Sequence, residues 1–136
     1  MTVFSSTELL QTTLKALFAH VGKDPQAAKA VVSSKLILRM QVTAPEANVV
    51  VNGRRDPPQI TYDKTTLRPD LEIELSADAL HKILLGELRL SSAVAARQLV
   101  VRGPIFKTFV FEEIFHSAQA FYPSVLEEVG LDGYSK

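Results

Sequence analysis

The three histidines are the side chains in this chain best suited to metal or proton chemistry. His20, His81 and His116 lie on three separate predicted helices, and their spacing is not that of metal ligands. Glu113 and His116 have the i, i+3 spacing that carboxylate di-iron bundles use, but such bundles need the motif twice, with further glutamates. We therefore expect no metal site, and we expect Glu113 and His116 to lie on the polar edge of a helix.

The sequence also lacks the other common catalytic signatures. It contains no cysteine, so neither a thiolate nucleophile nor a cysteine-type zinc site can form. It has no Gly-x-Ser-x-Gly elbow and no glycine loop suited to phosphate. Arg54-Arg55 follow the tight-turn signal Asn52-Gly53 and are expected at an exposed hairpin tip, with contact to a lipid headgroup as the alternative. These observations predict a protein that is not an enzyme and uses no cofactor.

Composition excludes two classes of partner. The 136 residues include 15 Lys+Arg and 15 Asp+Glu, without a basic stripe, so we expect no nucleic-acid binding. The longest apolar runs, such as Val49–Val51 and Phe109–Phe111, are far too short to cross a bilayer, so we expect no stable membrane insertion. The N-terminus does not resemble a signal peptide, and we expect a cytoplasmic protein.

Two helices are predicted at the start of the chain. Ser5 and Glu8 have the spacing of a capping box, and an apolar helical pattern follows as far as Gly22. Asp24-Pro25 then places an N-cap residue before a proline at the first helical position, which predicts a second helix to about Ser34.

The apolar period then changes to two, which predicts strands. In the fourth predicted strand, Leu71, Ile73 and Leu75 alternate with acidic residues. We expect the apolar set to be buried and Asp70, Glu72 and Glu74 to be solvated, as in an antiparallel sheet open to water on one side. The predicted strands are 36–43, 48–51, 59–62, 70–75 and 99–101, and two short helices are predicted at 76–85 and 91–97.

A late helical segment is apolar around most of its circumference. It carries five of the seven phenylalanines, which with their apolar neighbours cover well over half of the helix surface: Phe106, Phe109, Phe111, Phe115 and Phe121. Such a helix must be covered by protein on two sides or must face an apolar ligand. Phenylalanines at helical spacing are most often core residues, and a ligand cavity is the alternative.

Three blocks in the second half of the chain resemble the sterol carrier protein 2 (SCP2-like) domain family. They are Asp70–Leu80, Leu84–Leu88 and Leu99–Gly103, which combine an alternating strand ending in Leu-Ser, a helix ending in Gly-x-Leu, and a last strand ending in glycine. The resemblance is clearest over 70–115 and extends, as an order of elements, back to about residue 7.

This resemblance implies an α+β fold in which helices cover one face of a five-stranded, mainly antiparallel sheet and enclose an apolar tunnel for a lipid. We expect a single domain over 1–136, with a core at about 7–122 and an additional C-terminal segment at 123–136. An apolar cavity under the final helix would cover that helix without leaving an exposed patch. Its expected lining residues are Leu80, Ile83, Leu84, Phe106, Phe109, Val110 and Phe111.

Two functional hypotheses follow. The first is a lipid carrier that holds an acyl, sterol or isoprenoid-like chain as its hydrophobic small-molecule ligand. The second is an interaction or self-association module, accessory to lipid or quinone metabolism, that docks a partner through the same apolar surface. The sequence leaves a homodimer open.

Overall fold

The computed structural model describes residues 3–62, 65–104 and 107–134. Within these ranges the helices and strands follow the predicted order. The elements are α1 (Thr7–Val21), α2 (Pro25–Ser34), β1 (Ile37–Thr43), β2 (Ala47–Asn52), β3 (Gln59–Thr61), β4 (Leu71–Ser76), α3 (Ala77–Leu84), α4 (Leu90–Ala95), β5 (Leu99–Arg102), α5 (Phe109–Glu128) and the short 3-10 helix η2 (Asp132–Tyr134).

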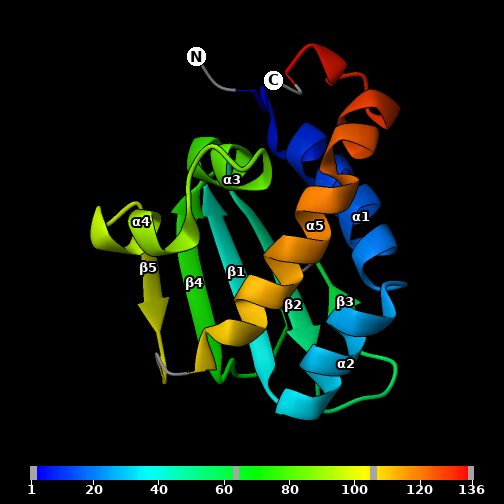
Figure 1. The fold of residues 1–136 in the computed structure, drawn as a ribbon, viewed down its shortest axis with the longest axis vertical. Coiled ribbons are helices and arrows are strands. Elements are labelled where there is room, and N and C mark those ends of the chain that lie inside the picture. The colour runs from blue at the N-terminus through cyan, green and yellow to red at the C-terminus, as the bar shows by residue number, and fades with distance from the viewer. Residues whose placement is uncertain (1–2, 63–64, 105–106, 135–136) are drawn as a thin grey trace.

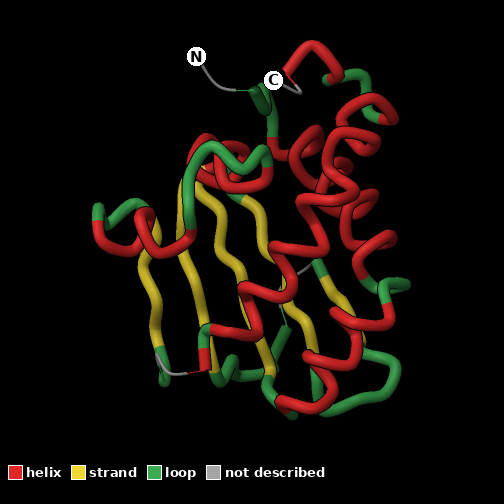
Figure 2. The backbone as a smooth tube through the Cα atoms, in the orientation of Figure 1, coloured by secondary structure: helices red, strands yellow, loops and turns green. Residues whose placement is uncertain are grey.

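The strands form a five-stranded sheet in the order β3-β2-β1-β4-β5. The pairs β1–β2, β2–β3 and β4–β5 are antiparallel, whereas the central pair β1–β4 is parallel. Helices α1, α2 and α5 lie over one face of this sheet, and α3 sits at the end of its central strands (Figure 1). The tube view separates this helical layer from the strands behind it (Figure 2). The predicted α+β class and mainly antiparallel sheet are confirmed.

Side-chain caps fix where the helices begin. The Asp24 side chain accepts a hydrogen bond from the Gln26 N–H, and Pro25 is the first residue of α2, as predicted. The predicted capping box of α1 is wrong by one residue, because Ser6 and not Ser5 is the N-cap. The Ser6 hydroxyl accepts from the Leu9 N–H at 3.1 Å, the bond that stabilises a helix start.

The turn signal Asn52-Gly53 does not form the tight left-handed turn that the sequence suggests. Neither residue has a positive φ, and the β2–β3 connection is a wide loop over residues 53–58. A glycine is needed here for a different reason. A Cβ atom on Gly53 would lie 2.5 Å from the carbonyl oxygen of Val31 and 2.7 Å from that of Leu36. The glycine therefore permits β2 to pass close to the end of α2.

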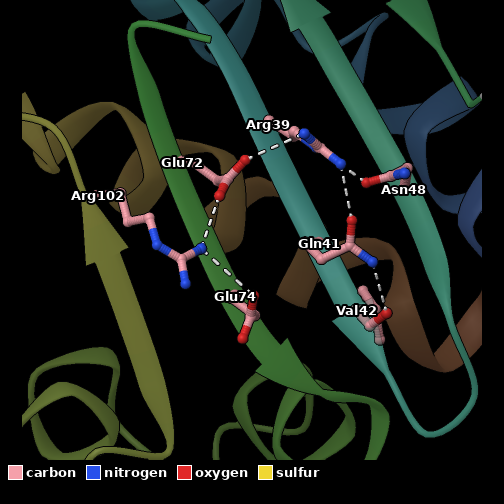
Figure 3. Close-up of polar contacts among 7 residues, drawn as sticks. All are labelled: Arg39, Gln41, Val42, Asn48, Glu72, Glu74 and Arg102. Atoms are coloured by element: carbon pink, nitrogen blue, oxygen red, sulfur yellow. Dashed lines mark hydrogen bonds and ion pairs between the residues drawn. The ribbon is translucent and has the colours of Figure 1, made fainter. Parts of the chain in front are cut away.

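The alternation in β4 divides the sheet into two faces, as predicted. Leu71, Ile73 and Leu75 are no more than 2% exposed on the helix-covered face. The acidic side chains opposite them are half-buried rather than freely solvated, because arginines cover them. Arg102 donates to Glu72 at 2.8 Å, and Arg39 lies 3.4 Å from the same carboxylate (Figure 3).

The late apolar helix is longer than its phenylalanine-rich part. Helix α5 begins at Phe109 and continues past residue 122, through Pro123, to Glu128. The predicted helical residue Phe106 lies outside the described residues. Two side chains of this extension, Val125 and Leu126, are fully buried and show that it packs on the rest of the protein.

Candidate functional site

A cavity lined by buried apolar side chains lies between the sheet and the helices α1, α3 and α5. Every side chain that lines it is apolar and at most 6% exposed. Three helices and two strands contribute to the lining, which therefore exists only in the folded chain. The lining residues are Leu14, Leu17 and Phe18 of α1, Leu38 and Met40 of β1, Val49 and Val51 of β2, Leu80 and Leu84 of α3, and Phe111, Ile114, Phe115 and Ala118 of α5.

The cavity is small. Its free volume is about 20 Å³, room for about one water molecule. The resemblance implied an apolar tunnel, but the described side chains close this space instead of leaving it open. A hydrocarbon chain can enter only when lining side chains or a covering helix move apart.

The structure brings part of the predicted site together. Leu80, Leu84 and Phe111 line the cavity. Ile83 and Val110 are buried, at 1% and 0% exposure, but do not border its free space.

Phe109 and Phe106 differ from the other predicted lining residues. Phe109 is 54% exposed and does not line the cavity. Phe109 and Phe111 are two residues apart, so their side chains point in directions about 200° apart around the helix. Because Phe111 points inward, Phe109 points outward. Phe106 lies outside the described residues.

The lining residues of α1, β1 and β2 were not predicted from the sequence. The spacing of Leu14, Leu17 and Phe18 identifies an apolar helical face, and Leu38 and Met40 share one face of a predicted strand. Such periodicity shows that these residues point inward. It contains no information on which helix covers which strand, so it could not assign them to the same cavity.

A buried polar pair lies beside the cavity, between α3 and α5. His81 Nδ1 is 2.6 Å from the hydroxyl oxygen of Tyr122, and the two residues are 8% and 0% exposed. Burial lowers the pKa of His81, and the opposing charges of Glu87 and Asp78 and a hydrogen bond to the Tyr134 backbone do not reverse that effect. Burial also raises the pKa of the Tyr122 phenol.

Both members of this pair are therefore uncharged at neutral pH. Because the Tyr122 O–H remains protonated, it can donate to the neutral imidazole of His81. A second polar bond joins the same two helices, since the Gln119 side-chain amide donates to the Ile83 carbonyl at 2.8 Å. Together these bonds tie α3 to α5.

The other histidines have separate surroundings. His20 stacks on Phe121 with ring centroids 5.1 Å apart and approaches Glu128 at 3.8 Å. His116 is exposed on α5, and Glu113, one turn earlier, is half-buried. Across residues 3–62, 65–104 and 107–134, no group of three or more histidine and carboxylate side chains is placed to hold a metal ion.

Arg54 is not a free residue at a loop tip. Its guanidinium donates to both carboxylate oxygens of Asp70, at 3.0 and 3.1 Å, and to the Lys35 carbonyl at 3.2 Å. Asp70 in turn accepts from the Ile37 N–H at 2.8 Å. Arg54 thus joins the β2–β3 loop to the starts of β1 and β4, which is a structural role. Arg54 and Arg55 are both exposed, as expected.

Comparison with protein families assigns the fold. The model of the SCP-2 sterol transfer family matches residues 14–116. The chain belongs to this family. The match begins inside α1 and ends inside α5, so it includes every residue that lines the cavity except Ala118. No curated protein sequence matches the chain. In the described part of the chain, no helix is long and apolar enough to cross a membrane.

Solved structures show the same fold at low sequence identity. The apo form of sterol carrier protein 2 from Yarrowia lipolytica is 17% identical, with a TM-score of 0.60 over 85% of this chain and 93% of that one. Sterol carrier protein domain 2 of Helicoverpa armigera is 16% identical, with a TM-score of 0.62 over 86% and 96%. A ubiquinone synthesis protein, UbiJ-SCP2, is 17% identical, with a TM-score of 0.57 over 86% and 94%.

Proposed function

We propose that this chain is a non-catalytic lipid carrier that holds an acyl, sterol or isoprenoid-like chain between the sheet and α5. The observation that carries the proposal is the chemistry of the cavity. Its thirteen lining side chains are all apolar, and they come from α1, β1, β2, α3 and α5. A site built in this way offers no hydrogen bond to a substrate and suits the hydrocarbon part of a ligand.

Burial of the ligand supplies the driving force. Removing apolar surface from water contributes about 25 cal/mol per Å², so about twelve buried methylenes would contribute on the order of 10 kcal/mol gross. Ordering of the ligand and displacement of the side chains that now fill the cavity reduce this value. The remainder is compatible with reversible binding, which a carrier requires.

Family membership supports the same proposal. The name of the family refers to sterol transfer, and two of the similar structures are named sterol carrier proteins. The third is named for ubiquinone synthesis, which supports keeping isoprenoid-like chains among the ligands to be tested.

The docking hypothesis requires an exposed apolar face. In the described part of the chain, the most exposed large apolar side chains are distributed over separate elements and form no common stripe on α5. Nine residues of α5 are buried instead. This distribution favours the carrier over the docking module. The exposed residues are Leu67, Val94, Val100, Phe109 and Tyr134.

Native mass spectrometry of the purified protein, combined with titration of a fluorescent fatty acid, tests the proposal. We expect a co-purifying lipid mass or direct binding of the probe. A probe with a dissociation constant of about 1 μM should stabilise the fold by about 2.7 kcal/mol at a hundredfold excess over that constant, measured in thermal melts. An empty dimer that binds no fatty acid, sterol or isoprenoid probe would contradict the carrier and support the docking module.

Two alanines of α5 provide a matched pair of variants. Ala118 lines the cavity and Ala120 is exposed on the same helix. Ala118→Leu adds volume where the ligand chain should lie, so we expect binding to weaken by about tenfold or more, at a cost of roughly 1–3 kcal/mol in stability. Ala120→Leu should leave the affinity for the probe unchanged. Equal affinities in the two variants would contradict the proposed cavity.

A further inference from the structure

A second apolar cavity lies beside the first, under the turn between α1 and α2. It also has a free volume of about 20 Å³. Its lining comes from α1, α2, β2, the β2–β3 loop, β3 and α5. The lining residues are Phe18, Val21, Gly22, Ala27, Ala28, Val31, Val51, Pro58, Ile60 and Ile114.

The two cavities share part of their walls. Phe18 of α1, Val51 of β2 and Ile114 of α5 line both of them. One layer of side chains therefore separates the second cavity from the first. If that layer opens, the two spaces become one continuous apolar channel.

The wall of the second cavity includes residues at the surface, whereas the wall of the first does not. All residues around the first are buried. Around the second, Gly22 is exposed and Ala28, Pro58 and Ile60 are half-buried. Strand β3, which carries Ile60, is an edge strand of the sheet, so one side of this cavity is not closed by a further strand.

Helix α2, which covers the second cavity, is held by few buried side chains. Only Ala27 and Val31 of α2 are buried, compared with six residues of α1 and nine of α5. On the other side of the first cavity, α3 is joined to α5 by the His81–Tyr122 and Gln119–Ile83 hydrogen bonds. Because little apolar surface is lost when small side chains separate, α2 is the covering helix that can move at the lowest cost.

We propose that the two cavities form one ligand channel, that the lipid chain enters and leaves between α2 and β3, and that Phe18 is the gate between them. This inference rests on the proposed carrier function. Among the three shared side chains, Val51 and Ile114 are β-branched and stiff at χ1. Phe18 is the largest of the three and can open the shared wall by changing its rotamer.

Absence of cysteine allows the mouth of the channel to be blocked at one chosen position. Ala28→Cys, labelled with a bulky maleimide, places an obstacle on the α2 side of the mouth. Val94→Cys with the same label is the control, because Val94 is 43% exposed on α4, next to the opposite edge strand β5. Stopped-flow measurement of fluorescent fatty acid uptake and release gives the exchange rates of both proteins.

We expect the label at residue 28 to slow uptake and release by about tenfold, a barrier increase of about 1.4 kcal/mol. The equilibrium affinity should stay the same, because an obstacle in the path slows entry and exit alike. The label at residue 94 should change neither rate. Unchanged rates in the residue 28 protein, with normal binding at equilibrium, would overturn the route while leaving the carrier function intact. Absence of binding in the unsubstituted chain would contradict the carrier function itself.

A second pair of variants tests the gate. Phe18→Ala removes a wall shared by both cavities, whereas Phe115→Ala enlarges only the first. We expect Phe18→Ala to accelerate release by about tenfold, and Phe115→Ala to change affinity without a comparable acceleration. Equal acceleration in both variants would overturn the gate. If Phe18→Ala does not fold, Phe18→Leu, which retains an apolar side chain but shortens it, replaces it in the same comparison.

Discussion

The two faces of β4 show how one strand serves two kinds of interaction. On the helix-covered face, Leu71, Ile73 and Leu75 are almost completely removed from water. On the other face, Glu72 lies between Arg39 and Arg102, whose side chains are 36% and 57% exposed. Burial of a large apolar side chain contributes about 1.5–3 kcal/mol, whereas an exposed ion pair contributes about 0–1 kcal/mol.

This difference shows where the stability and the candidate function of the domain reside. The apolar face forms the core and also one wall of the cavity, through Leu38 and Met40 of the neighbouring strand β1. The ionic face covers the other side of the same strands with arginine and glutamate side chains (Figure 3). Changes on the first face should therefore affect folding and binding together, whereas changes on the second should affect neither strongly.

The largest effect is expected for Ile73→Asp. Ile73 is 1% exposed, and a carboxylate at this position would be buried without a partner. We expect loss of the cooperative unfolding transition in circular dichroism melts. A folded Ile73→Asp protein with a melting temperature close to that of the parent would show that the assigned register of β4 is wrong.

Tyr122→Phe should have the next largest effect. It removes the hydroxyl that bonds to His81 and leaves a buried imidazole nitrogen without that partner. We expect a loss of about 1–3 kcal/mol in the free energy of unfolding, measured by urea denaturation. Tyr134→Phe, at a residue that is 37% exposed, is the control and should change stability little. Equal losses in the two variants would indicate that the buried hydrogen bond contributes nothing.

Stability should also depend on the protonation of His81. Its folded-state pKa is lowered by burial from the usual value of about 6.5. Above that value both the folded and the unfolded states are neutral at this residue. As pH falls below it, the unfolded chain binds the proton first, so the free energy of unfolding should decrease until the folded pKa is also passed. Urea denaturation at a series of pH values should show a flatter dependence for His81→Gln than for the parent, and parallel curves would contradict this assignment.

The smallest effect is expected for Glu72→Gln on the ionic face. The substitution removes the charge between Arg39 and Arg102 but keeps the shape and an oxygen acceptor. Because both arginines remain accessible to water, we expect a loss below about 1 kcal/mol, and a smaller difference still in high salt. A loss comparable to that of Tyr122→Phe would show that the two faces do not differ in the way proposed.

Much of the fold could be predicted from local patterns. The capping by Asp24 with Pro25, the two faces of β4 and the order of helices and strands all follow from the residue sequence within a few positions. The local predictions that were wrong are those for which the sequence fits two local structures almost equally well. Either Ser5 or Ser6 could cap α1, and Asn52-Gly53 fits a tight turn as well as a close approach of two backbone segments.

The candidate site was predicted less completely than the fold. Phe111, Leu80 and Leu84 line the cavity, but Phe109 faces outward because the inward side of α5 is set by its packing against α1, α2 and α3. The parallel pairing of β1 with β4 was also not predicted from the sequence. After β3, at one edge of the sheet, the chain passes β2 and β1 before β4 begins, and no local pattern shows this crossover.

The sequence by itself determined which residues share a face of a helix or a strand, because side-chain direction repeats with the period of that element. Only the tertiary structure decided that residues of α1, β1, β2, α3 and α5 meet around one space, and that this space is closed to about 20 Å³. The volume of a cavity is a small difference between the space that the backbone encloses and the space that the side chains fill. That difference depends on the relative positions of all these elements at once, and no local pattern contains it.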